Sequence, residues 1–361
     1  DANTTASDNT AVGNAALGAN TTGALNTAVG AGSLDANTTG GDNTAVGFSS
    51  LSANTTAAGN TAMGYRGLLS NTTGASNVAV GKDSLVNNTT ASNNTAVGKD
   101  ALKANTTGTQ NTAIGSLAGD AITTADENVT VGFNSLTTNT KSFYNVAVGN
   151  SVLAAHNLTS DAAGYNTGIG HNAGAAVTTA VQNTLIGALA GDAITTGSFN
   201  VATGFGALGA ATTAVQNAAF GRLSLEDNTT GANNTAIGNH SLGSNTTAAN
   251  NTGVGYFALG ANTTGTSNTS VGANSLDANT TGANMVAVGN NALGKNTTAS
   301  FNIGIGSGAL AENTTGAENV AIGYLALTNN TTGTHNVALG ASDGSSGATL
   351  GTNSAGSNNT A

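Results

Sequence analysis

The tripeptide Asn-Thr-Thr recurs along the chain and is the pattern with the clearest chemical potential. Asn-x-Thr is the acceptor sequence for N-linked glycans, which are attached to the amide nitrogen of the Asn side chain. The motif therefore predicts a chain decorated with one glycan per copy. The candidate sites are Asn3, Asn20, Asn37, Asn54, Asn71, Asn88, Asn105, Asn228, Asn245, Asn262, Asn279, Asn296, Asn313 and Asn330.

A structural role explains the same motif. Stacked Asn amides and Thr hydroxyls form hydrogen-bonded ladders in cross-β stacks, where no glycan fits. Three copies have an aliphatic residue in place of the Asn and keep both Thr, and they also have Gly in place of a Leu three residues earlier. The exchanged pairs are Gly119 with Ile122, Gly174 with Val177 and Gly191 with Ile194. The exchange indicates that the two positions share one interior space.

The threonines of the motif form two uncharged columns, of which only one should face outward because neighbouring strand residues alternate. A flat Thr array at strand spacing suits ice binding, and carbohydrate is the other ligand considered. The simpler explanation is that Thr favours strands. The candidate binding face is the column of first Thr residues: Thr21, Thr38, Thr55, Thr72, Thr89, Thr106, Thr229, Thr246, Thr263 and Thr280.

Nothing in the sequence indicates catalysis. The four His residues, His156, His171, His240 and His335, occupy unrelated positions, and no Gly-x-Ser-x-Gly motif is present. The Gly-rich segments lack the Lys and the helix of a phosphate-binding loop. The chain has no Cys and therefore no thiolate metal site. We expect no enzyme activity, no metal and no cofactor.

A tandem repeat of 17 residues carries these motifs. Its consensus is N-T-A-V-G-x-x-A-L-x-A-N-T-T-G-x-x, whose positions we number 1 to 17, starting for example at Asn9, Asn26 and Asn43. Gly at positions 5 and 15 would interrupt a helix, and a unit this short must stack on its neighbours to bury a core. We predict an all-β parallel β-solenoid (β-roll) of about 21 coils of 17 residues over residues 1–340, with two short strands per coil.

The sequence also predicts which positions are buried and where the array is irregular. Aliphatic residues at position 4 and Leu at position 9 should form the core, whereas charged residues cluster at positions expected to be turns. A spacing of 21 between Asn145 and Asn166 indicates a four-residue insertion near 156–165. Residues 341–361 lose the pattern and should form a degenerate final coil, a cap or a linker.

Composition limits the partners. The net charge of −10 includes no basic cluster, which argues against nucleic acid. No apolar run approaches the roughly 18 residues that a membrane span requires, so none is expected.

The N-T-A-V-G-x-x-A-L unit resembles the head repeats of trimeric autotransporter adhesins, which carry an (S/T)-(V/I)-A-I-G core and fold as a left-handed parallel β-roll. Those repeats are shorter. The full 17-residue unit is similar to arrays in tail-fibre-like bacterial and phage surface proteins. The resemblance implies an extracellular or cell-surface location, a fibrous shape, trimerisation and adhesion.

These observations lead to one functional hypothesis and one alternative. The chain is expected to be a structural or adhesive extracellular fibre or shaft segment, which self-associates as a trimer or end to end. The alternative is an ice-binding or carbohydrate-binding solenoid that uses the Thr ladder.

Overall fold

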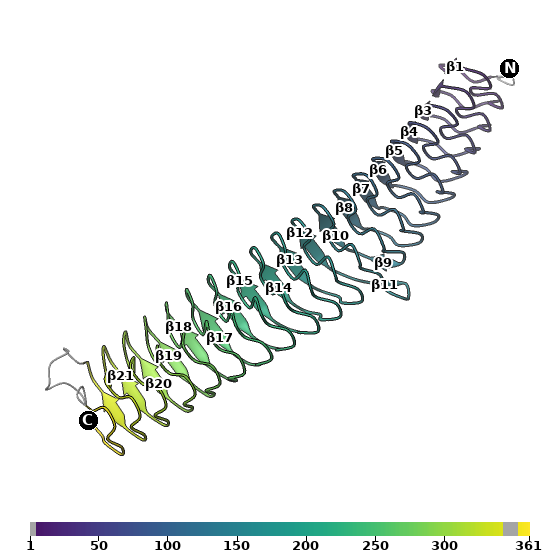
Figure 1. Cartoon of the computed structure of the whole chain (residues 1–361). Helices are drawn as coiled ribbons and strands as arrows, with labels where there is room; N and C mark the ends of the chain where they lie inside the picture. The colour runs from purple at the N-terminus through teal and green to yellow at the C-terminus, as the bar shows by residue number, and fades with distance from the viewer. Residues whose placement is uncertain (1–4, 342–352) are drawn as a thin grey trace. The chain divides into compact units, whose positions relative to one another are not determined.

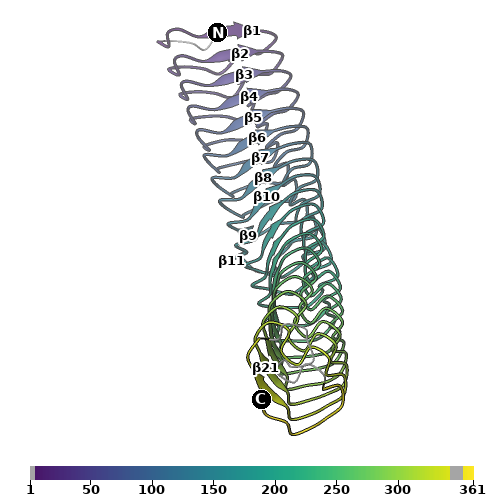
Figure 2. The same ribbon diagram turned by 90° about the vertical axis from the view of Figure 1, so that its left-hand side faces the viewer.

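The computed structural model describes residues 5–341 and 353–361, and all regular elements within them are short β-strands. The predicted parallel β-solenoid with 17-residue coils is confirmed: successive turns of the chain stack with one strand above the next (Figures 1 and 2). The chain divides into two compact units, residues 1–182 and 183–361, which we describe separately.

In unit 1, residues 1–182, ten strands pair in parallel in chain order. Each strand residue pairs with the one 17 positions later, as Thr10 does with Thr27, except between β10 and β12. The strands are β1 (Thr10–Val12), β2 (Thr27–Val29), β3 (Thr44–Val46), β4 (Thr61–Met63), β5 (Val78–Val80), β6 (Thr95–Val97), β7 (Thr112–Ile114), β8 (Val129–Val131), β10 (Val146–Val148) and β12 (Thr167–Ile169). A second pair, β9 (Ser142–Phe143) with β11 (Ala162–Ala163), lies beside the insertion.

Unit 2, residues 183–361, repeats this arrangement with ten strands in chain order and the same shift of 17 residues. The strands are β13 (Thr184–Ile186), β14 (Val201–Thr203), β15 (Ala218–Phe220), β16 (Thr235–Ile237), β17 (Thr252–Val254), β18 (Thr269–Val271), β19 (Val286–Val288), β20 (Ile303–Ile305), β21 (Val320–Ile322) and β22 (Val337–Leu339).

A regular coil has one strand, at positions 2 to 4, and the prediction of two strands per coil is wrong. The Thr residues of the Asn-Thr-Thr segment do form backbone hydrogen bonds to the next coil, but these bonds do not make a regular β-ladder. The amides of Thr38 and Thr39 both donate to the single carbonyl of Thr55, at 2.9 and 3.2 Å. A strand would need alternating donors and acceptors along its edge. The second strand of a coil occurs, within the described residues, only at β9 and β11.

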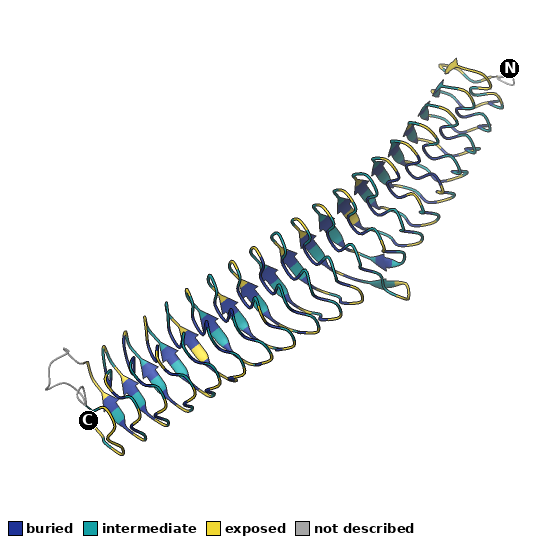
Figure 3. Cartoon of the chain, viewed as in Figure 1, coloured by how far each residue is buried: buried dark blue, intermediate teal, exposed yellow. Residues whose placement is uncertain are grey.

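The core lies at positions 3 and 9, and the prediction that position 4 is buried is wrong. Ala28 at position 3 and Leu34 at position 9 have no exposed surface. In contrast, Ile114 and Ile237 at position 4 are 41% and 43% exposed. Side chains alternate along a strand, so a buried position 3 forces positions 2 and 4 outward (Figure 3). Position 3 is Ala in most coils, and the larger Leu185 is buried there in a coil that has Gly191 in place of Leu at position 9.

Glycine at position 5 is required by the stacking of coils. Gly47 has a φ of +134°, and a Cβ added there would lie 2.3 Å from the carbonyl oxygen of Gly64 in the next coil. Any side chain would therefore push neighbouring coils apart.

Position 9 has a left-handed backbone, with a φ of +50° at Leu34. Leu is strained in this conformation by about 1 kcal/mol, and its burial offsets the strain. Gly119 and Gly191 adopt the same conformation without strain. A Cβ at Gly191 would lie 2.7 Å from Cδ1 of Ile194, which is itself fully buried. Positions 9 and 12 therefore share one interior space, as the exchange between copies indicates.

Two irregular segments interrupt the 17-residue register. Val146 of β10 pairs with Thr167 of β12, a shift of 21 residues, and Ala162 of β11 pairs with Ser142 of β9, a shift of 20, so three of the four extra residues precede β11 and one follows it. At the other end, Thr360 pairs with Val337, a shift of 23 residues. Residues 353–361 thus return to positions 12 to 17 and 1 to 3 of the repeat. Residues 342–352 of the segment expected to be degenerate lie outside the described residues.

Candidate functional site

The Asn residues at position 12 form a buried ladder between coils. The Nδ2 group of Asn37 donates to Oδ1 of Asn20 in the preceding coil at 3.0 Å and to the carbonyl of Gly40 in its own coil at 2.9 Å. The same two bonds recur one coil later from Asn54. Each amide nitrogen therefore uses both of its protons inside the solenoid.

The structure places every described candidate glycosylation site in this ladder, fully buried. The residues are Asn20, Asn37, Asn54, Asn71, Asn88, Asn105, Asn228, Asn245, Asn262, Asn279, Asn296, Asn313 and Asn330. Asn3 lies outside the described residues. A glycan replaces one proton of Nδ2 and needs a path to solvent, so the folded coil has no room for one at these positions.

A second Asn ladder at position 1 runs beside the strands. The backbone amide of Asn43 donates to Oδ1 of Asn26 at 3.0 Å, and Nδ2 of Asn43 donates to the carbonyl of Ala57 at 2.9 Å. Asn43 and Asn26 are fully buried. Two polar columns therefore hold each regular coil to its neighbours, and they satisfy groups that would be costly to bury alone.

Position 13 does not form the exposed Thr face. The hydroxyl of Thr38 donates to the carbonyl of Thr55 in the next coil at 3.1 Å, and these side chains are half-buried. The same holds for the other candidates: Thr21, Thr55, Thr72, Thr89, Thr106, Thr229, Thr246, Thr263 and Thr280. The exposed Thr column lies one residue later, at position 14, for example at Thr39.

Sequence reasoning missed a set of glycan acceptor sequences whose Asn is exposed. In each, two Asn residues precede a Thr, and the first Asn faces solvent while the second is more buried. Asn233 is exposed beside the buried Asn234, for example. The members are Asn87, Asn93, Asn233, Asn250, Asn329 and Asn358. The doubled Asn was the available signal, but burial was needed to tell the two residues apart.

The His residues form no catalytic group. His156 takes the place of the ladder Asn at position 12, is fully buried, and has Nε2 3.0 Å from Oγ of Ser142. Burial lowers the pKa of His156 to about 4, against a smaller opposing effect of the Thr178 backbone. Among the described residues, no three His, Cys, Asp or Glu side chains lie close enough together to hold a metal ion.

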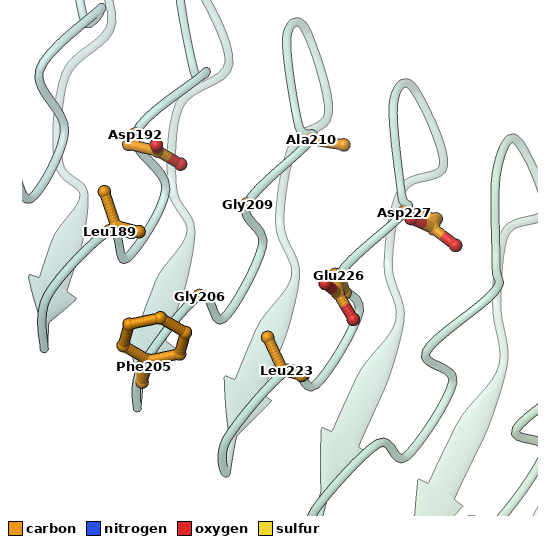
Figure 4. A pocket seen from close by; sticks show the side chains of 9 residues that line it. All are labelled: Leu189, Asp192, Phe205, Gly206, Gly209, Ala210, Leu223, Glu226 and Asp227. Carbon is orange, nitrogen blue, oxygen red and sulfur yellow. The ribbon is translucent and has the colours of Figure 1, made fainter.

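A shallow pocket of about 300 Å³ opens between three coils of unit 2 (Figure 4). It exists because the middle coil has Gly206 and Gly209 where its neighbours have side chains. Leu189, Asp192, Phe205, Leu223, Glu226 and Asp227 line it. Partial burial raises the pKa of Asp192. The lining includes carboxylates and apolar groups, but no nucleophile beside a base.

The outward face of the sheet is a regular surface whose positions 2 and 4 carry no charge in either unit. Positions 2 and 4 point out from each strand and hold Thr or aliphatic residues, with few exceptions such as Phe220 and Met63. In unit 1, seven of the ten residues at position 2 are Thr. The predicted site residues did not include this face. The repeated Thr-Ala-Val tripeptide could have indicated it, because its small central residue suits the interior and leaves the two flanking residues outside.

No protein-family model matches this sequence, and no curated protein matches it. Within the described residues, no helix has the length and apolar character needed to cross a membrane. Function is therefore inferred from the geometry of the coils.

Proposed function

We propose that this chain is a structural segment of an extracellular fibre or shaft. The observation that carries the proposal is the coil-to-coil Asn ladder. Asn37 bonds to Asn20 as Asn54 bonds to Asn37, so a coil can be added or removed without changing any type of contact. In such a chain the number of coils determines the length of the segment, and the residues at outward positions can differ from coil to coil without affecting the stacking. The likeness to adhesin heads and tail-fibre arrays supports a surface location, self-association and an adhesive role.

The test is the removal of whole coils. Deleting residues 26–93, which are four regular coils of 17 residues, should leave the protein folded with little change in melting temperature. The native fibre should shorten by about 19 Å, or about 4.8 Å per coil, in electron micrographs. The control is deletion of residues 77–85, which breaks the register and should unfold the neighbouring coils. A fibre of unchanged length after the four-coil deletion would contradict the proposal.

If the chain is glycosylated in its natural setting, we expect the glycans on the exposed Asn residues. After secretion from a glycosylating host, enzymatic glycan release in heavy-oxygen water should label Asn87 and Asn233 but not the buried Asn88 and Asn228. Asn233→Gln should remove one glycan without lowering the melting temperature. A labelled Asn88 in folded protein would show that the ladder does not exclude the modification.

Ice binding is the second candidate function. The Thr-rich sheet face of unit 1 is a better candidate surface for it than the half-buried Thr column at position 13. Two outward columns on one strand give a regular uncharged grid, with Thr44 and Val46 as a representative pair. Thermal hysteresis of the purified chain, reduced by Thr44→Lys with Val46→Lys and not by Thr39→Lys, would support this function. Protein that shows no hysteresis at any concentration would exclude it.

A further inference from the structure

The outward sheet face of unit 2 becomes fully aliphatic over its last four strands. From β19 to β22, positions 2 and 4 of each strand are Val, Ile or Leu, whereas β16 to β18 have Thr at position 2. The aliphatic residues are Val286, Val288, Ile303, Ile305, Val320, Ile322, Val337 and Leu339. They all lie on one side of the sheet, because the alternate residues Ala287, Gly304, Ala321 and Ala338 sit at position 3.

These side chains are partly exposed although they are apolar. Ile322 is 40% exposed and Leu339 is 60% exposed, and the other six are half-buried by their neighbours on adjacent strands. No charged residue occupies position 2 or 4 on any strand of unit 2. A contiguous apolar patch of this kind marks an interaction site more often than a bare surface, and parallel sheets usually have both faces covered.

We propose that this face of unit 2 binds the same face of a second copy of the chain. The inference rests on the proposed function, because it names the surface through which the chains of a fibre would associate. Two copies present side chains at the same coil spacing, so their columns can interdigitate along the whole stack. The face carries no charge of its own to repel an identical face.

The size of the face agrees with an association that depends on concentration. The whole ten-strand face, at about 4.8 Å per strand and about 3.3 Å for each of three residues, has a footprint of about 480 Å² per copy, of which the four aliphatic strands make up about 190 Å². A stable pair buries about 800 Å² per partner. The rim adds to the footprint, since Phe301 and Tyr324 beside the patch are 57% and 55% exposed. Glu318 and His335, whose side chains lie 2.7 Å apart, give the rim a polar edge.

The experiment uses matched lysine pairs on the full chain. Ile303→Lys with Ile305→Lys places two charges outward at the centre of the patch on β20. Thr95→Lys with Val97→Lys makes the same change on β6 of unit 1. In sedimentation experiments the apparent mass of the unchanged chain should rise with concentration from 34.4 kDa towards twice that value. The β20 variant should need about 100-fold more protein to do so, whereas the β6 variant should behave as the unchanged chain.

A charge-reversed partner tests whether the occupant is the same face of a second copy. Ile303→Glu with Ile305→Glu should also fail to associate alone, and mixing it with the lysine variant should restore a pair. Circular dichroism melts check folding, and Ile303→Thr with Val320→Thr is a milder variant that copies the Thr pattern of β16 to β18. An unchanged chain that stays at 34.4 kDa, an equal loss in the β6 variant, or a mixture without recovery would overturn the inference. None of these results bears on the coil-deletion test of the proposed function.

Discussion

Asn88→Asp is expected to destabilise unit 1 by about 3–5 kcal/mol at neutral pH, although it only replaces the side-chain NH2 group by an oxygen and leaves the side-chain volume nearly unchanged. Nδ2 of Asn88 donates to Oδ1 of Asn71 at 2.8 Å and to the carbonyl of Ala91 at 3.0 Å. A carboxylate has no proton to donate, so the substituted oxygen would face two acceptors in a fully buried site. Only the bond that Asn105 donates to residue 88 would remain.

The neighbouring residue supplies the control. Asn87→Asp makes the same chemical change at an exposed side chain and should alter stability by less than about 0.5 kcal/mol. Chemical denaturation of both variants gives the comparison. Lowering the pH should partly restore Asn88→Asp, because a protonated Asp can donate one bond. Equal stability of the two variants would show that the ladder contributes little.

Acidification from pH 6.5 to pH 4 is expected to loosen the coil that contains His156, by about 3 kcal/mol. The pKa of this side chain is lowered from 6.5 to about 4 by burial, so the folded coil holds the neutral imidazole. Between pH 6.5 and pH 4 the imidazole of His156 is protonated in the unfolded segment but neutral in the folded coil. The stabilising effect is therefore complete above pH 6.5 and is lost as the pH falls towards 4.

Hydrogen exchange measured by mass spectrometry can localise this effect. Amides in residues 142–166 should lose protection across this pH range, after correction for intrinsic exchange, while residues 77–111 should not. His156→Asn restores the consensus residue of position 12 and should remove the pH dependence. His171→Asn, at an exposed side chain, should leave it intact. A uniform response of all coils would contradict the assignment to His156.

The period, the parallel stacking and the insertion were predictable from the sequence, because each depends only on spacing. Even the inward direction of position 12 could be inferred, since the exchange of Gly191 with Ile194 reveals a shared volume. The direction of position 4 could not. Hydrophobicity does not say on which side of a strand a residue lies, and here the inward position 3 is Ala in most coils while Val and Ile lie outside at positions 2 and 4.

The candidate binding residues were less predictable than the fold. Thr38 and Thr39 are identical in type, and only the bond from Thr38 to the next coil decides which of them is exposed. The doubled Asn residues pose the same problem, because Asn233 and Asn234 differ in burial and not in chemistry. The spacing of a repeat determines which residues stack on one another. It does not determine which side chains face solvent, and binding depends on those side chains.

The close contact at position 5 has a genetic consequence. A Cβ at Gly47 would meet the backbone carbonyl of Gly64, so a coil can carry a following coil only if it has Gly at this position. A gene segment that duplicates as a whole repeat brings its own Gly and fits at once, whereas a partial duplication does not. Unequal recombination between whole repeats can therefore lengthen or shorten the protein in one step, while replacing the Gly of position 5 in a stacked coil should destabilise it.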